Sequence, residues 1–335
     1  MLRIDRLKAY TEDYPIDNWQ PSAKPFMLQA RADLLAFLRA YFAEQSVMEV
    51  DPPLLATTSV TDINIESIGA QAMGQSCFLQ TSPEFFMKRL LASGAGDIYS
   101  LGKVFREAEQ GSRHNPEFTL LEWYRLNWDE FQLITEVENL VVGAYQAIQN
   151  SQISVSRTSY GDCFEQTLGI DPHGEKLSVL QSLAEEKGYP QWRSETRANC
   201  LDLLFSELVE PQLSKGIVTV YDYPACQAAL AQIHQDAKGR PVSRRFECFL
   251  NGMELANGYF ELTDAEQQLQ RFHQDIEQRQ LTNKPAMSID AKLDLAMQQG
   301  LPSCSGVALG VDRLLMQLSD AQSITKVMAF PWNRC

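Results

Sequence analysis

The sequence contains no long apolar segment and no cysteines placed to act together. No run of about 18 uncharged apolar residues occurs, so we expect no transmembrane helix. The first residues carry scattered charges and lack an apolar centre, which argues against a secretory signal peptide. The seven cysteines are an odd number, lie far apart and form no CxxC pair. They favour buried, reduced thiols in a cytoplasmic protein over a disulfide framework or zinc ligands.

Basic residues are also scarce. The 29 lysines and arginines are outnumbered by 43 aspartates and glutamates, which leaves a net charge of -14. Because nucleic-acid binding depends on cationic side chains that neutralise phosphates, tight binding to a nucleic acid is disfavoured. In contrast, 44% of the 335 residues are hydrophobic, which is enough for the core of one large domain or two smaller ones.

The spacing of apolar residues predicts both helices and strands along the chain. The expected helices span residues 25–45, 84–93, 129–149, 264–280 and 289–299, and residues 160–215 are predicted to be mostly helical. The expected strands span residues 47–55, 77–80, 98–106, 118–126, 217–222 and 244–261, and a strand from residue 305 leads into a helix that ends near 318. Ser82 is expected to cap its helix. Because the strands mostly pair as hairpins, we predict an α+β fold with an antiparallel sheet.

The segment FREAEQGSRHNPEFTLLEWY combines basic and acidic side chains around a loop and a strand. Strand alternation places Glu122 and Tyr124 on one face with Phe118 and Leu120, which predicts a pocket for an ammonium group. Arg106 lies at the end of the preceding strand, where its fork of donors could hold a phosphate. The alternative is a solvated charged loop.

The segment RRFECFLNGMELANGYFE contains a hairpin turn at Asn251-Gly252, a residue pair that a type I′ turn favours. This turn pairs Phe249 with Glu254 and places Glu247 diagonally opposite Glu254 on the same face. Two such carboxylates are costly unless a cation lies between them, and magnesium is the natural candidate. The alternative is an exposed acidic face.

The segment SGVALGVDRLLM places small residues before Arg313, which lies near the start of a helix. Acidic residues are normally preferred there, so an arginine indicates an anionic ligand. A phosphate-binding loop of the Walker type is excluded, because Gly96 and Gly102-Lys103 have the wrong spacing and Val104 follows.

Together these segments resemble the three signature motifs of class II aminoacyl-tRNA synthetases, here Glu49–Pro53, Phe105-Arg106 and Gly306–Arg313. Arg113–Thr119 and Glu254–Gly258 resemble the lysine-specific branch more closely. The likeness extends from about residue 25 to the C-terminus. It implies an α+β catalytic domain at residues 25–335, with an antiparallel sheet flanked by helices and a helical insertion at about 160–215. Residues 1–24 would form an N-terminal arm.

Lysyl-tRNA synthetases carry an anticodon-binding OB-fold of about 100 residues or more before this domain. Only about 25 residues precede the first motif here, so we expect no such domain. The chain is therefore most similar to the elongation factor P lysine ligases, which are truncated paralogues of lysyl-tRNA synthetase. Ala308 supports this choice, because the ligases typically carry Ala where the synthetases carry Gly.

The resemblance implies a role for individual residues. The catalytic residues would be Arg106 and Arg313, which clamp the triphosphate. The ATP site would also include Ala108, His114, Asn115, Glu254, Leu255 and Gly310, and Mg²⁺ would be held by Glu247 and Glu254. The amino-acid pocket would be lined by Ser82, Glu84, Glu122, Tyr124, Asn257, Glu261 and Ala308. The family usually has Arg-x-Glu in the second motif, whereas here Ala108 lies between Glu107 and Glu109, so a neighbour replaces that Glu or the contact is lost.

The implied function is ATP-dependent activation of (R)-β-lysine, or of lysine, as an aminoacyl-adenylate. The acyl group would then pass to a lysine side chain of elongation factor P. Three alternatives remain: a lysyl-tRNA synthetase core acting on tRNA, a catalytically inactive accessory subunit, and an amide synthetase with a small-molecule product. The acidic charge disfavours the first, the intact Arg106, Glu254 and Arg313 disfavour the second, and the lysine-type motifs disfavour the third.

Two structural predictions follow from these assignments. The first motif of this fold packs across a two-fold axis, so we expect a homodimer that uses Phe26–Leu55. In addition, a regular strand cannot direct Glu254, Asn257 and Glu261 to one side, because their offsets from Glu254 are odd. We therefore predict a β-bulge between Glu254 and Tyr259, most readily at Ala256-Asn257-Gly258, since glycine tolerates the backbone angles that a bulge requires.

Overall fold

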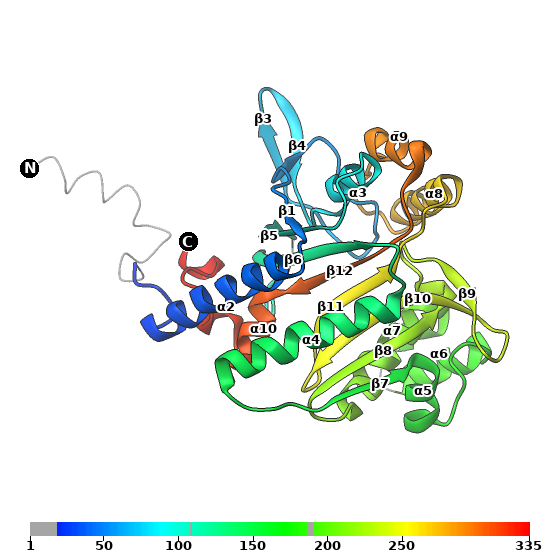
Figure 1. The fold of residues 1–335 in the computed structure, drawn as a ribbon. Coiled ribbons are helices and arrows are strands. Elements are labelled where there is room, and N and C mark those ends of the chain that lie inside the picture. The colour runs from blue at the N-terminus through cyan, green and yellow to red at the C-terminus, as the bar shows by residue number, and fades with distance from the viewer. Residues whose placement is uncertain (1–18, 108, 187–189) are drawn as a thin grey trace, which may run out of the picture.

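The computed structural model describes residues 19–107, 109–186 and 190–335, so the predicted arm and Ala108 lie largely or wholly outside the described residues. Within this part of the chain, nine strands form one sheet (Figure 1). Its order is β1 (Met48–Glu49), β5 (Ile98–Phe105), β6 (Glu117–Leu126), β12 (Cys304–Gly310), β11 (Met253–Phe260), β10 (Pro241–Leu250), β8 (Ile217–Pro224) and β7 (Val155–Ser159). The remaining strand, β9 (Ile233–Gln235), pairs with β10.

The predicted antiparallel pairing holds for the centre of this sheet, and the two edges correct it. The strands from β5 to β8 pair antiparallel, whereas β1 pairs parallel to β5 and β7 pairs parallel to β8. The sheet is therefore mixed. The edge strand β7 was not predicted, because its side chains are polar and mostly exposed and show no apolar alternation.

A smaller sheet was also not predicted in full. It joins β2 (Leu55–Ala56), β4 (Gln75–Leu79) and β3 (Gly69–Ala72), and its hairpin projects from the body of the molecule (Figure 1). The sequence predicted β4 but missed β3, because Gly and Ala have low strand propensity. The expected strand at residues 47–55 is divided into β1 and β2, between which lie two prolines.

The predicted helices are confirmed to within a few residues. They are α2 (Pro25–Glu44), α3 (Glu84–Ala92), α4 (Glu130–Gln149), α8 (Ala265–Leu281), α9 (Ala291–Gly300) and α10 (Val311–Leu318), and residues 160–215 contain α5 (Tyr160–Leu168), α6 (Leu177–Glu186) and α7 (Arg197–Leu204). The start of α4 is fixed by a capping box between Asp129 and Gln132. The expected cap at Ser82 is wrong, because Pro83 occupies the cap position and no side-chain bond caps the helix.

One face of the sheet is covered by α2, α4 and α10 (Figure 1). Their buried side chains share a core with inward-facing residues of the strands; for example, the Phe42 ring stacks on Tyr99 and meets Trp123 edge-on. The other face is flanked by α3, α8 and α9 near β5 and by α5–α7 near β8, each group with its own apolar cluster. Between these two groups, the helices of the described ranges leave part of the sheet uncovered. None of the helices in the described ranges combines the length and apolar character that a bilayer crossing needs.

Candidate active site

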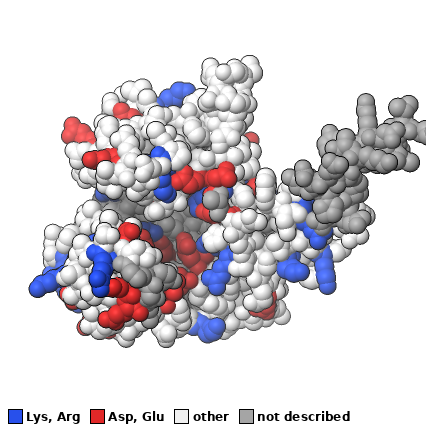
Figure 2. Space-filling view, turned by 180° about the vertical axis from the view of Figure 1, so that it is seen from behind, with Lys and Arg blue, Asp and Glu red and all other residues white. Residues whose placement is uncertain are grey.

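The uncovered part of the sheet forms the floor of a cavity of about 820 Å³. Its walls come from the β4–α3 junction, the loop after β5, the start of α10 and the helix α7. Seen from behind, the molecule is hollowed on this face, and acidic side chains gather in and around the hollow (Figure 2). The predicted site residues that line the cavity are Ser82, Glu84, Arg106, His114, Asn115, Glu122, Tyr124, Glu254, Leu255, Asn257, Glu261, Ala308, Gly310 and Arg313.

Two predicted site residues do not appear among these lining residues. Ala108 lies outside the described residues. Glu247 faces a smaller neighbouring cavity. The other predicted residues come from five segments of the chain, 82–84, 106–115, 122–124, 254–261 and 308–313, and they line one cavity.

One end of the cavity is anionic and largely buried. The side chains of Glu122 and Glu261 are 3% and 1% exposed, and Glu84 lies beside them at the start of α3. The Tyr124 hydroxyl donates a hydrogen bond of 2.9 Å to Glu122. Burial, reinforced by the charge of Glu84, raises the pKa of Glu122 well above its usual range and that of Glu261 to about 7. This end is suited to a ligand that brings positive charge.

A lysine that the sequence analysis did not single out completes the anionic end. The Lys88 ammonium is 1% exposed and lies 2.7 Å from a Glu84 oxygen and 2.8 Å from a Glu261 oxygen. Burial alone would lower the pKa of Lys88, but the charges of Glu261 and Glu84 raise it above its usual value. The spacing of four residues between Glu84 and Lys88 was a visible signal, which on an exposed helix denotes only a weak ion pair.

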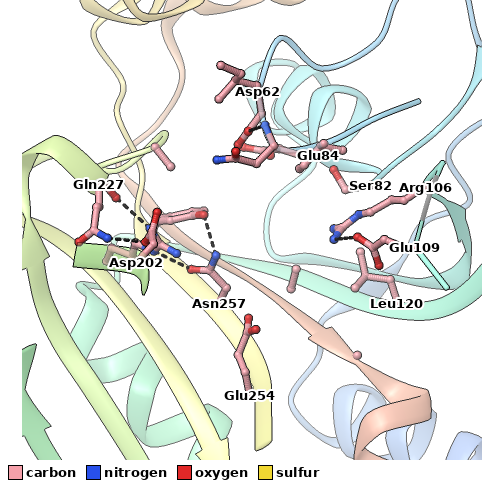
Figure 3. Close-up of a pocket in the computed structure, with 18 of the residues that line it drawn as sticks. Asp62, Ser82, Glu84, Arg106, Glu109, Leu120, Asp202, Gln227, Glu254 and Asn257 are labelled. Atoms are coloured by element: carbon pink, nitrogen blue, oxygen red, sulfur yellow. Dashed lines mark hydrogen bonds and ion pairs between the residues drawn. The ribbon is translucent and has the colours of Figure 1, made fainter. Parts of the chain in front are cut away.

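The opposite end of the cavity is cationic and more open. Arg106 donates to Glu109 at 3.3 Å, and its guanidinium lies 5.2 Å from the centre of the Phe118 ring (Figure 3). Arg313 donates to Glu254 at 3.2 Å and to His114 Nε2 at 2.7 Å. Because an arginine can only donate, Nε2 of His114 accepts and its proton resides on Nδ1. Burial and the adjacent Arg313 lower the pKa of His114, so the ring is neutral at physiological pH.

The position of Arg313 is fixed from behind by a buried ion pair. Its neighbour Asp312 accepts 2.6 Å hydrogen bonds from the Arg31 guanidinium and from the Thr119 backbone amide. These contacts tie the start of α10 to α2 and β6. As predicted, Arg313 lies in the first turn of a helix.

Asn115 lines the cavity, but both ends of its amide are bonded to backbone. Its nitrogen donates to the carbonyl of Glu117 at 2.6 Å, and its oxygen accepts from the amide of Trp332 at 2.8 Å. The side chain therefore holds the C-terminal segment against the loop after β5. Each bond uses one of the two donors or one of the two acceptor sites of the amide, so the predicted contact of Asn115 with ATP stays a prediction.

The predicted β-bulge is present in β11, at a different residue. Phe249 pairs with Glu254 as expected, but Cys248 pairs with Ala256, so the extra residue is Leu255. The register is regular from Ala256 onward. Because the bulge resets the alternation, Glu254 and Asn257 point from β11 into the same space (Figure 3).

Gly258 has another purpose than the one predicted. A Cβ added to Gly258 would lie 2.3 Å from Cζ of Phe246. The glycine is thus required for close packing against that ring, and the bulge forms without a glycine.

Glu247 lies beside Glu254 and is held by two neighbours. The Arg245 guanidinium binds one of its oxygens, and the Tyr223 hydroxyl donates to the other at 2.7 Å. Arg245 also donates to Asn257 at 3.2 Å, so it links β10 to β11. Burial and the nearby Glu254 charge raise the pKa of Glu247 to about 7, although Arg245 opposes this. Arg245 was missed from the sequence because a cation two residues from a carboxylate is an ordinary surface pattern.

The pair of Glu247 and Glu254 fits a magnesium ion that takes most of its ligands from phosphates and water. In the free protein Glu247 is paired with Arg245 and Glu254 with Arg313, so a magnesium ion would take Glu254 over from Arg313. Among the described residues, no group of three or more His, Cys, Asp or Glu side chains is arranged to hold a metal by itself. Glu254 lines the main cavity, whereas Glu247 lines the smaller neighbouring cavity.

Comparison with known proteins identifies the family. Residues 17–334 match the family described as tRNA synthetases class II (D, K and N). The chain belongs to this family. Curated relatives in bacteria are similar over nearly their whole length, and those from three species are each named elongation factor P--(R)-beta-lysine ligase.

The relative from Pasteurella multocida is 44% identical over 94% of this chain and 97% of its own length. Those from Pseudoalteromonas translucida and Yersinia pestis are 44% and 42% identical, over 95% and 94% of this chain and 99% and 98% of their own lengths. Family membership thus confirms the class II synthetase fold predicted from the motifs at residues 49–53, 105–106 and 306–313.

Proposed function

We propose that this protein is an ATP-dependent, AMP-forming ligase that activates (R)-β-lysine and transfers it to a lysine side chain of elongation factor P. One observation carries the proposal: a single cavity has arginines suited to phosphates at one end and three carboxylates suited to ammonium groups at the other. The names of the relatives agree with both the substrate and the acceptor.

The reaction has two steps. In the first, a carboxylate oxygen of the amino acid attacks the α-phosphorus of ATP, the bond to the bridging oxygen breaks and pyrophosphate leaves. In the second, the acceptor amine attacks the acyl carbon, AMP departs and the amine loses a proton. Neither step requires a nucleophile from the protein, so catalysis rests on positioning and on charge.

Arg106 and Arg313 supply the charge at the phosphate end. In the free protein they are paired with Glu109 and Glu254, at 3.3 and 3.2 Å, and about a quarter of each arginine side chain is exposed. Phosphate oxygens can therefore replace these carboxylates as partners without uncovering a buried charge. Neutral His114 keeps one donor of Arg313 in place and adds no positive charge of its own.

Glu254, with Glu247 behind it, would hold the magnesium ion, which when bound neutralises charge on the phosphates. Of the two carboxylates that flank Ala108, Glu109 lines the cavity and Glu107 does not. We therefore assign to Glu109 the place of the usual second-motif glutamate.

The anionic end selects the amino acid. Glu84, Glu122 and Glu261 together would balance the ammonium groups of a diamino acid, and Tyr124 would orient Glu122 through its 2.9 Å hydrogen bond. Ala308 pairs with Glu122 across β12 and β6 and with Asn257 across β12 and β11. Its methyl group thus stands at the centre of the pocket floor, where it would favour the shifted amino group of β-lysine over that of α-lysine.

The proposal is tested by incubating the protein with ATP, each lysine isomer and either elongation factor P or tRNA. We expect pyrophosphate release with (R)-β-lysine and a mass increase of one lysyl group on elongation factor P. Mass added to tRNA would support the synthetase alternative. Absence of pyrophosphate release with every isomer would reject ligase activity.

We also propose that the protein acts as a cytoplasmic homodimer through Phe26–Leu55. In this segment Phe26 and Met48 are 66% and 50% exposed, Leu54 and Leu55 are also exposed, and β1 lies at an open edge of the sheet. Apolar surface of this kind commonly marks an interface. Sedimentation should give a dimer at micromolar concentration, and Phe26→Asp should shift it to a monomer; a monomeric wild type would contradict the assignment.

A further inference from the structure

The ion pairs of Lys88 are unusual for a helical lysine, because the ammonium has no access to water. The pair with Glu84 is local to α3, whereas Glu261 follows β11 and lies far away in the sequence. A lysine is almost never fully buried unless it is paired, and here it is paired twice. The side chain therefore belongs to the electrostatics of the pocket as much as to the packing of α3.

The groups that face Lys88 come from each surrounding element. They are Glu84 of α3, Glu122 of β6 with Tyr124 bonded to it, Glu261 after β11 and the thiol of Cys304 in β12. In the described part of the chain, Lys88 is the cation that contacts this set, since Arg106 and Arg245 are paired with Glu109 and Glu247. Its charge opposes the rise in the pKa of Glu122 and of Glu261.

We propose that Lys88 is a positioning residue that sets the charge of the amino-acid pocket so that it accepts a substrate with two ammonium groups. When ionised, Glu84, Glu122 and Glu261 carry three negative charges, and Lys88 cancels one of them. The remaining two equal the charge of the two ammonium groups of a diamino acid, whose carboxylate faces the cationic end. This inference rests on the proposed function of the pocket and adds to it the residue that fixes the charge balance.

The geometry distinguishes this role from simple packing. Lys88 bridges Glu84 and Glu261, so it holds them side by side against their mutual repulsion. If Glu261 were neutral, however, Lys88 would compete with the substrate for Glu84 and leave the pocket with too little negative charge. The effect of removing Lys88 must therefore change sign with the charge state of Glu261, which a packing role does not predict.

The test is a double-mutant cycle of Lys88→Met and Glu261→Gln, with KM for (R)-β-lysine measured by ATP–pyrophosphate exchange between pH 6.5 and 9. In the wild-type background, Lys88→Met should raise KM about tenfold or more at pH 7 and shift the midpoint of its pH dependence upward by about one unit. In the Glu261→Gln background, the same substitution should lower KM. Lys103→Met, which removes an exposed lysine paired with Glu117, is the matched control and should change neither value.

The outcomes separate the two proposals. A rise in KM of equal size in both backgrounds, or one independent of pH, would assign Lys88 to packing and overturn this inference alone. Lys88→Met by itself could leave Glu261 buried without its partner and fail to fold. The double variant lacks both members of that pair, so comparing its KM with that of Glu261→Gln still tests whether loss of Lys88 lowers KM in this background. A neutral-side-chain analogue such as 6-hydroxynorleucine should bind the wild type poorly. If no diamino acid supports exchange in the wild type, the proposed function fails, and this inference fails with it.

Discussion

The two ends of the cavity differ in the sign of their charge and in how far that charge is exposed to water. At the anionic end, Lys88, Glu122 and Glu261 are almost inaccessible to water. At the cationic end, Arg313 and Glu254 are 24% and 38% exposed. Charge that is buried before the substrate arrives must be balanced internally, by Lys88 and by raised pKa values. A partly exposed charge can be held by a partner that the ligand later replaces, because water also screens that charge.

This difference indicates a division of labour. The buried end is preformed and selective, since an imperfect ligand would leave unpaired charge in a site without water. The open end exchanges partners, so it can receive a triphosphate and release pyrophosphate. Substitutions at the two ends should accordingly affect different kinetic constants.

The largest effect is expected at the open end, from Glu254→Gln. The substitution keeps the shape of the side chain but removes its charge, so the protein should fold normally and lose adenylate formation by about a thousandfold or more, which is ~4 kcal/mol of transition-state stabilisation. Pyrophosphate exchange and thermal melting measure the two properties. Glu117→Gln removes an exposed carboxylate and should be neutral. Near-normal exchange by the Glu254 variant would reject its role with magnesium.

Gly306→Ala should damage the buried end alone. A Cβ at this position would lie 2.3 Å from Cε1 of Tyr124 and 2.6 Å from Oε1 of Glu261. The displaced side chains should raise KM for the amino acid by about 10- to 100-fold, as expected from ~1–3 kcal/mol of overpacking, and leave KM for ATP unchanged.

Gly258→Ala is the matched control for that substitution. Its Cβ would strike the Phe246 ring in the core. It should therefore lower the melting temperature without changing the preference among amino acids. Equal losses of amino-acid affinity in both glycine variants would show that the two ends are not independent.

The pH dependence of amino-acid binding should also be confined to the buried end. The pKa of Glu261 is about 7, so at pH 6 this carboxyl holds a proton that a bound ammonium group must displace, and burial raises the pKa of Glu122 in the same direction. KM for (R)-β-lysine should therefore fall by up to about tenfold per pH unit as the pH rises toward 7, and level off above it. KM for ATP should vary less over this range. A pH-independent KM for the amino acid would show that Glu261 is already ionised in the free protein.

The smallest effect is expected from Ala308→Gly. Loss of one methyl group from the pocket floor should shift the ratio of kcat/KM for α-lysine and β-lysine toward α-lysine by about tenfold, the discrimination that one methyl group typically provides. Both isomers should be measured by pyrophosphate exchange. An unchanged ratio would remove Ala308 from the account of specificity.

Strand parity and helical periodicity were enough to predict much of the site. The alternation of β6 correctly grouped Leu120, Glu122 and Tyr124 on the cavity face, and the Asn251-Gly252 turn has both residues at positive φ, as its type requires. Both features depend only on residues that are close in the chain, so they can be predicted from the sequence. The need for a bulge in β11 followed from parity as well.

Other features could not be predicted because they depend on contacts between distant segments. The extra residue of the bulge is Leu255, whereas Gly258 packs against Phe246, and neither position shows in the local sequence. The strand β7 pairs at an edge where its own side chains give no apolar pattern. His114 is neutral because it is buried beside Arg313 of α10.

The sequence by itself determined the helices, most of the strands and which residues share a face, since these follow from local spacing, and its motifs indicated the family by resemblance. Only the tertiary structure decided how charge is distributed. The four-residue spacing of Glu84 and Lys88 by itself predicts a weak ion pair on a helix surface. In the folded protein Glu261 also contacts Lys88, and the lysine is buried. The electrostatic energy of a pair depends on the medium around it, and that medium is created by the packing of segments that are far apart in the chain.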